Sequence, residues 1–208
     1  MIDKASFSSM LCAAAGLLDQ NSDWLSQIDS KYGDGDHGIT MRKVARLMVE
    51  RVEAWGDVPL KEFLDNLGDG IMEVRGGSAG PLYGTLVCGL AEGLEDGENE
   101  VSAAGLKRMF ASCLAEMQEI TTAQVGDKTM MDALIPAVQA AQEAPDNERA
   151  VLEAAACAAD QGVRASEGFA SKFGRARSYG DQTIGTPDAG AASTMLILRG
   201  FMEGYQSA

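Results

Sequence analysis

Apolar residues recur at spacings of three and four over most of the chain, and this period favours helices over strands. In the segment 101–120, VSAAGLKRMFASCLAEMQEI, Ser102 is suited to cap the helix. Its apolar residues at helical spacing are Leu106, Met109, Phe110, Cys113, Leu114 and Met117. No run alternates apolar and polar residues as a strand does, and no Asn-Gly hairpin turn occurs. The sequence therefore predicts an all-α fold.

Turn residues between the periodic segments divide the chain into eight expected helices. They lie near residues 4–28 (with an interruption near Asn21), 38–54, 59–74, 82–94, 102–119, 129–142, 147–171 and 191–205. Pro59 suits a first helical turn, whereas Pro136 lies inside the sixth helix and should kink it. The 208 residues are 46% hydrophobic, which is enough for one sizeable core, so we expect a single domain over residues 1–208.

The seven junctions between these helices alternate in character. The second, fourth and sixth, WGDVP, EDGENEVS and EAPDNE, are ordinary polar turns. The other four hold most of the junction glycines and unusual polar residues; they read DSKYGDGDHG, RGGSAGPLYG, TTAQVGDKT and FGRARSYGDQTIGTPDAG. Alternate junctions of an antiparallel up-and-down bundle lie at the same end. The sequence therefore predicts that these four loops form one site at one end of an eight-helix barrel or bundle.

The first of these loops brings three carboxylates close together. Asp29 falls at the end of the first helix, and Asp34 and Asp36 follow within the loop. Two unit charges 4 Å apart repel by about 4 kcal/mol at an effective dielectric of about 20, so such carboxylates either point apart into water or hold a cation. Hard carboxylate oxygens suit Mg²⁺, which completes its shell with phosphate oxygens. The spacing is not that of an EF-hand, which excludes that calcium motif.

Glycine in the first two unusual loops suits contact with an anion. The glycines of the first loop are Gly33, Gly35 and Gly38. They permit positive φ angles and leave backbone N–H groups accessible. The second loop, RGGSAG, places Ser78 among three glycines just before a helix, whose N-terminus attracts anions. Glycines that only end helices explain one glycine per junction but not RGGSAG. The spacing of a Walker A loop is absent.

Few positive side chains lie in the unusual loops. Arg175 and Arg177 are candidates to face phosphates, and each is equally suited to the surface. Lys128 is open to two interpretations, a phosphate contact or a lysine at a helix end. His37 is the only histidine and lies at an expected helix N-terminus, where the dipole disfavours imidazolium. A neutral donor to phosphate is therefore its better role, and no charge-relay triad can be built.

The amino-acid composition limits the kinds of partner and the compartment that we expect for this chain. The formal net charge is −14 and no Lys/Arg-rich run occurs, so we expect no nucleic-acid partner and a metal bridge to any anionic ligand. No apolar run approaches the roughly 18 residues that cross a bilayer, and the N-terminus lacks a signal-peptide layout. We therefore expect a cytoplasmic protein without membrane contact. The four cysteines form no C-x-x-C pair and lie in apolar or small-residue segments, which predicts buried, reduced thiols.

Four ordered motifs extend over most of the chain: GDGDHG, GGSAGPLYGT, VGDKTMMDALIPA and GRARSYGDQTIGTPDAGAAS. Together, over residues 29–194, they resemble the nucleotide-binding L subunit of the dihydroxyacetone kinase family. The resemblance implies a barrel of eight antiparallel helices with the nucleotide at one end. It also implies two Mg²⁺ ions on Asp29, Asp34 and Asp36 that bridge to the phosphates of ADP or ATP. The implied phosphate and nucleotide contacts are His37, Gly38, Ile39, Thr40, Ser78, Ala79, Met130, Arg175, Asp188, Ala189 and Gly190.

The resemblance further implies half of an enzyme. The family phosphorylates a small ketose that a separate K subunit binds covalently through its own histidine, and no K module fits in 208 residues. The L chain then needs no base of its own, and no catalytic residue is assigned beyond the metal–phosphate site. The phosphoryl donor stays open between ATP and a phosphotransferase-system protein. A transcriptional regulator is a further partner that L-type proteins bind.

The chain departs from the family pattern in its last loop. The family has G-H-x-D-P-G-A where this chain has GTPDAGA, with Thr186 in place of histidine and Ala189 in place of proline. The aspartates are unaffected, but the sugar stays open between dihydroxyacetone and a related ketose such as erythrulose. Two other classes of function remain as alternatives. One is a Mg²⁺-dependent phosphohydrolase, which needs His37 or a spare aspartate as base, and the other is a non-catalytic nucleotide sensor.

Overall fold

The computed structural model describes all 208 residues, and nearly all of its regular structure is helical. The helices are α1 (Lys4–Gln20), α2 (Ser22–Asp29), α3 (His37–Glu53), α4 (Leu60–Met72), α5 (Ala79–Glu92), α6 (Ala103–Ile120), α7 (Met131–Glu143), α8 (Glu148–Ser166), the 3-10 helix η1 (Arg175–Thr183) and α9 (Ala189–Ser207). One backbone bridge pairs Ile2 with Val101 and ties the N-terminus to the loop before α6. The all-α prediction is confirmed.

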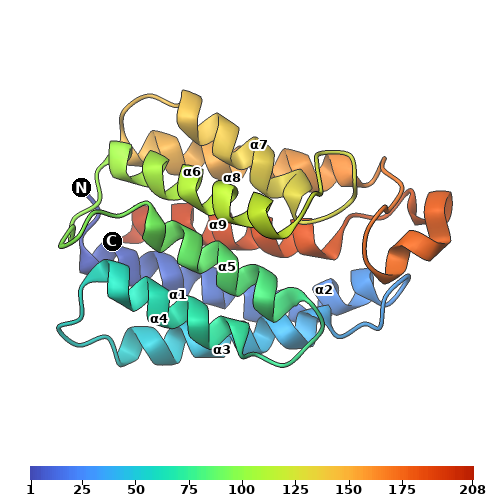
Figure 1. The fold of residues 1–208 in the computed structure, drawn as a ribbon, viewed down its shortest axis with the longest axis horizontal. Helices are drawn as coiled ribbons and strands as arrows, with labels where there is room; N and C mark the ends of the chain where they lie inside the picture. Colours follow the sequence, from blue (N-terminus) through green and yellow to red (C-terminus); the bar gives the residue numbers. More distant parts are fainter.

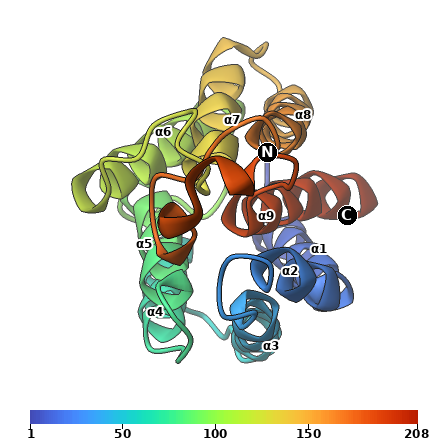
Figure 2. The ribbon, with the colours of Figure 1, turned by 90° about the vertical axis from the view of Figure 1, so that its right-hand side faces the viewer.

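The long helices form a closed antiparallel ring. Its order is α1, α3, α4, α5, α6, α7, α8, α9, and α9 packs back on α1. Figure 2 looks along the helices and shows this ring, with η1 lying across its near end. A single cluster of 53 buried apolar residues joins the helices, so the barrel has one continuous core. No helix combines the length and the apolar character needed to cross a membrane.

The two ends of the barrel carry different loops. Both chain termini and the three ordinary polar junctions lie at one end, on the left of Figure 1. The four unusual junctions and η1 lie at the other end, on the right. The prediction that the unusual loops gather at one end is therefore confirmed.

The expected interruption at Asn21 is present and separates α1 from α2. The larger differences from the expected helix boundaries lie at α8, α5 and η1. The seventh expected helix, 147–171, corresponds to α8 and ends at Ser166 instead of residue 171. The Ser166 carbonyl there accepts a hydrogen bond from Lys128 Nζ, and its Oγ accepts one from Asp188 N. Helix α5 begins at Ala79, three residues earlier than expected, and η1 was not predicted.

Helix α7 continues unbroken through Pro136. Proline has no N–H to bond the carbonyl four residues earlier, which belongs to Asp132. Gly162 of α8 packs on this stretch, where an added Cβ would lie 2.9 Å from Ala133 Cα. The missing side chain at Gly162 therefore lets α8 approach the backbone of α7 closely.

The cysteine prediction is wrong in part. Cys113 is buried and Cys88 is half-buried, but Cys12 and Cys157 are exposed. Cys157 lies between two alanines and Cys12 precedes three, and alanine marks neither the inner nor the outer face of a helix. Burial raises the pKa of the Cys88 thiol to about 11 and that of Cys113 to about 12.

Candidate functional site

All four unusual junctions line a single pocket at one end of the barrel, with a volume of about 560 Å³. This size lies within the usual range of small-molecule sites. The lining residues are Asp29, Gly33, Asp34, Asp36, His37, Gly76, Gly77, Ser78, Ala79, Leu82, Tyr83, Thr121, Lys128, Thr129, Met130, Met131, Ser171, Phe173, Gly174, Arg175, Ala176, Asp188, Ala189 and Gly190. Segments more than 100 residues apart in the sequence thus build one wall.

Four helices begin at this pocket. Their first residues are His37 in α3, Ala79 in α5, Met131 in α7 and Ala189 in α9, and all four line the pocket. A helix N-terminus carries a partial positive charge and N–H groups without helical partners. The antiparallel ring therefore directs four such ends at one cavity, which favours an anion there even though the chain is acidic overall.

The three aspartates of the first loop come together on one side of the pocket. One carboxylate oxygen from each of Asp29, Asp34 and Asp36 lies within 4.8 Å of the other two. Gly33 makes this possible, because an added Cβ would lie 2.9 Å from Asp29 Cγ and would overlap Asp29 Oδ1. The donor set is three hard oxygens without sulfur, and it fits Mg²⁺. These three residues are the ones that would hold the ion.

His37 lies between the aspartates and α9. Its Nε2 is 2.8 Å from Ser193 Oγ, and its backbone N–H donates a long hydrogen bond of 3.5 Å to Asp29 Oδ2. Burial lowers the pKa of the imidazole, and the Asp29 charge only partly opposes this effect. The ring is therefore neutral at neutral pH, as the sequence predicts.

A buried tyrosine joins α5 to the start of α9. The Tyr83 hydroxyl donates to the Gly190 carbonyl at 2.8 Å and lies 2.6 Å from Ser193 Oγ and 3.0 Å from Thr194 Oγ1. Burial raises the pKa of this phenol well above its usual value. Ser193 contacts both Tyr83 and His37, so the three side chains form one polar network under the pocket. Sequence reasoning missed this network, because nothing local marks Tyr83 as polar core.

Lys128 fixes the third loop to the fourth. It is the only non-glycine residue with a positive φ, 59°, and its side chain is buried. Its Nζ donates to the Ser166 carbonyl at 2.6 Å and to the Thr186 carbonyl. Of the two interpretations left open, the structure supports the structural one, since both contacts are to backbone. Burial lowers the pKa of Lys128, against the attraction of Asp188, Asp132 and Glu167.

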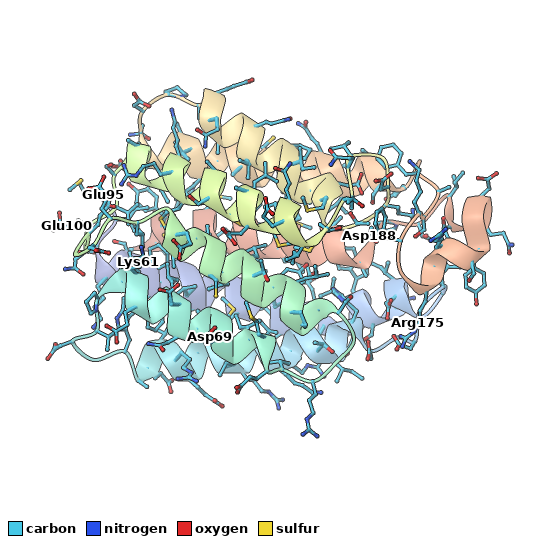
Figure 3. All side chains as sticks on the ribbon, in the orientation of Figure 1. Lys61, Asp69, Glu95, Glu100, Arg175 and Asp188 are labelled. Atoms are coloured by element: carbon cyan, nitrogen blue, oxygen red, sulfur yellow. The ribbon has the colours of Figure 1, made fainter.

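Two further carboxylates shape this side of the pocket. Asp132 accepts from Gly126 N and Thr129 N, each at 2.6 Å, and so folds the loop before α7. Asp188 caps α9 by accepting from Ala191 N at 2.7 Å. Burial raises the pKa of Asp188 to about 7, although the Ala191 N–H opposes the shift. Figure 3 shows Asp188 at the pocket end of the barrel.

The structure brings most of the expected nucleotide contacts into the pocket wall. Those that line it are His37, Ser78, Ala79, Met130, Arg175, Asp188, Ala189 and Gly190. Gly38, Ile39 and Thr40 lie outside it. Gly38 packs on the backbone of α2 at Ser22, and Ile39 is 54% exposed. Arg177 is also exposed and outside the wall.

Thr40 lies directly behind the glycine-rich loop. Its hydroxyl is buried without a hydrogen-bond partner, and an added Cβ on Gly76 would overlap it. A buried unpaired polar group costs about 1–3 kcal/mol. In front of Thr40, the backbone at Gly76 and Gly77 adopts positive φ angles of 153° and 52°, which favour glycine. These features fit a loop that folds around a ligand oxygen.

Nearly all of the segments that build this site lie within the part of the chain that matches a known protein family. The DAK2 domain family matches residues 31–203, which include nearly every pocket segment. The chain belongs to the DAK2 domain family. This DAK2 chain is 27% identical over 201 residues to the ADP-binding subunit DhaL of the PEP-dependent dihydroxyacetone kinase of Escherichia coli, covering 95% of each chain. It is 31% identical over 216 residues to the corresponding subunit of kinase 2 of Listeria innocua, covering 100% of this chain and 98% of that one.

Solved structures give the same fold. The crystal structure of the dihydroxyacetone kinase of C. freundii matches this DAK2 chain with a TM-score of 0.73 and 26% identity, over 94% of this chain and 34% of that one. The same kinase in complex with AMP-PNP and Mg²⁺ matches with a TM-score of 0.72 and 25% identity, over 94% and 33%. The DAK2 chain thus spans about a third of that kinase.

Proposed function

We propose that this chain is the Mg²⁺–ADP/ATP-binding subunit of a two-component kinase. Its substrate would be dihydroxyacetone or a related small ketose held on a separate K-type subunit. The observation that carries this proposal is one pocket that combines three clustered aspartates with four helix N-termini. The aspartates suit two magnesium ions, and the N–H groups and the glycine-rich loop suit phosphates. The relatives named above, an ADP-binding subunit and a kinase solved with AMP-PNP and Mg²⁺, support the same assignment.

The chain's own residues would bind and orient rather than react. Bound Mg²⁺ supplies neutralisation of phosphate charge during phosphoryl transfer. Asp29, Asp34 and Asp36 would hold the metal, while Ser78 and Ala79 at the start of α5 offer backbone N–H groups to phosphate. Neutral His37, fixed by Ser193, would orient a phosphate oxygen without taking a proton. The acceptor hydroxyl would come from the partner.

The rim of the pocket suits a protein partner. Most exposed large hydrophobic side chains lie on segments at the pocket end: Trp24, Ile39, Met72, Ile120, Val125, Phe173, Tyr179 and Ile184. Apart from these, only Met1 and Val58 are similarly exposed. Their concentration at this end of the barrel is the distribution expected of an interaction surface. We assign this rim to the K-type subunit, whose sugar would then face the pocket.

The test is reconstitution. The chain is mixed with a K-type subunit, dihydroxyacetone or erythrulose, and either Mg–ATP or a phosphotransferase-system donor protein, and ketose phosphate is measured. We expect product only when both subunits are present, and the productive donor and ketose assign those two partners. Ketose phosphorylation by the chain alone, or steady phosphate release from ATP without a partner, would contradict the proposal. A transcriptional regulator as a further partner stays a prediction.

A further inference from the structure

The segment 174–184, here called the lid, arches over the pocket and is fixed firmly only at its feet. At one foot Lys172 N donates to Asp127 O at 3.1 Å and Ser171 N donates to Thr183 Oγ1 at 2.9 Å. At the other, Gly185 N donates to Glu167 O at 2.7 Å. The arch between the feet is mostly exposed, and of η1 only Thr183 is buried.

Glycine hinges stand at the ends and in the middle of the lid. Gly174, Gly180 and Gly185 have φ angles of 61°, 51° and 92°. An added Cβ at any of the three would meet nothing within 4 Å, so these glycines serve conformation and not close packing. The lid can therefore change shape without disturbing the barrel.

Three contacts, two from Tyr32 and one from Arg175, hold the arch to the loop between α2 and α3. The Tyr32 hydroxyl donates to the Gln182 carbonyl, and the Tyr32 ring packs on Tyr179 with 5.3 Å between centroids. Arg175 forms an ion pair with Asp34. Figure 3 shows Arg175 next to this loop, at the pocket end of the barrel. Arg175 is the only basic side chain that forms an ion pair with any of the three clustered aspartates.

A divalent metal ion can readily replace Arg175 as the partner of Asp34. The two side chains are 66% and 39% exposed, and ion pairs at that exposure contribute only about 0–1 kcal/mol. A divalent ion carries twice the charge of a guanidinium and prefers the same hard oxygens. Arginine stays charged because it does not lose its proton, so once Asp34 coordinates a metal, the Arg175 guanidinium is free to attract another anion. It already lines the pocket in which phosphates would lie.

We propose that Arg175 is a removable cation that links metal binding to the lid. Without a divalent ion it supplies the positive charge at Asp34 and holds the lid to the metal loop. When the ion binds the aspartates, Arg175 is released, the lid stays attached through Tyr32, and the guanidinium turns to the phosphates. This inference rests on the proposed function, because it takes the aspartates as the metal site.

The first test is the affinity for Mn²⁺ alone, measured by electron paramagnetic resonance without nucleotide. Arg175→Ala removes the competitor, so we expect Mn²⁺ to bind about two- to fivefold more tightly than in the wild type, the range that corresponds to the strength of an exposed pair. Arg175→Lys should keep most of the wild-type affinity. Arg177→Ala is the matched control, because it removes an equal charge from the same lid without an ion pair. Equal Mn²⁺ affinity in Arg175→Ala and Arg177→Ala overturns the proposal.

The second test is hydrogen exchange of residues 174–184. Mg²⁺ alone should speed exchange in the wild type, Mg–ADP should slow it, and Arg175→Ala should exchange fast with or without Mg²⁺. Tyr32→Phe should speed exchange under every condition, because it removes the hydrogen bond to the Gln182 carbonyl while keeping the ring packing on Tyr179. A lid whose exchange does not respond to Mg²⁺ in the wild type contradicts the proposal. Neither test uses phosphoryl transfer, so a failure of the kinase assignment in the reconstitution assay remains distinguishable from a failure of the lid mechanism.

Discussion

Tyr83 of α5 and Gly190 in the first turn of α9 are joined by a hydrogen bond from the phenol to the carbonyl, with 2.8 Å between the oxygens. Tyr83→Phe deprives Gly190, Ser193 and Thr194 of this buried partner. We expect a loss of about 1–3 kcal/mol in the free energy of unfolding, measured by urea denaturation, and weaker binding of Mg–ADP. Tyr205→Phe is the control, since that hydroxyl makes no hydrogen bond. Equal stability of the two variants would contradict the role given to Tyr83.

The closure of the ring depends on Gly200. An added Cβ on Gly200 of α9 would lie 2.8 Å from Ala14 Cβ and still closer to the Ala14 backbone in α1. Gly200→Ala should therefore destabilise the protein by about 1–3 kcal/mol. Gly16→Ala in α1 has nothing within 4 Å and should stabilise by about 0.5–1 kcal/mol through helix propensity. Thermal unfolding should show shifts of opposite sign, and a stabilising Gly200→Ala would refute this packing.

The stability of the ligand-free protein should depend on pH through Asp188. Its pKa is raised from 3.8 to about 7, so the folded state binds this proton more tightly than the unfolded state. This contribution to stability is greatest below pH 3.8 and falls as the pH rises towards 7. Asp188→Asn keeps a side chain that can cap α9 but removes the titration. We expect the variant to exceed the wild type in melting temperature at pH 8 and to match it near pH 4. A difference in melting temperature between the variant and the wild type that does not change with pH would contradict the role given to the Asp188 carboxyl.

Removing the Thr40 hydroxyl should not harm the ligand-free fold. Thr40→Val keeps the shape and deletes a buried hydroxyl that has no partner, so we expect a gain of about 1 kcal/mol in unfolding free energy. Thr194→Val is the matched change at a buried threonine whose hydroxyl does have a partner, Tyr83, and it should destabilise. Chemical denaturation of both variants decides the point. Equal destabilisation would show that the Thr40 hydroxyl is paired in solution.

The sequence was sufficient to predict the barrel and the position of the site because both depend on regular patterns. The helical spacing of the apolar residues predicted the helices. The alternating character of the junctions predicted that four loops lie at one end, where the pocket is found. The aspartate cluster could be predicted for the same reason, since Asp29, Asp34 and Asp36 are close in sequence and Gly33 allows a tight loop.

What the sequence did not predict depends on contacts between distant residues. The end of α8 at Ser166 is fixed by Lys128 and Asp188, from other loops. The 3-10 helix η1 has no apolar period, and it is held by Tyr32 and Asp34, about 150 residues away. The polar network of Tyr83 spans three helices, and no local pattern marks it.

The central claim is that an acidic chain binds a polyphosphate through metal held on its clustered aspartates. Asp36→Asn tests it most directly, because Asp36 forms no ion pair within the protein and its loss disturbs no other contact of that kind. Asp57→Asn, an exposed aspartate in the loop between α3 and α4, is the control. Calorimetric titration with Mg–ADP should show binding weakened by at least about tenfold in Asp36→Asn and unchanged in Asp57→Asn. Mg–ADP affinity equal to that of the wild type in Asp36→Asn would contradict the account.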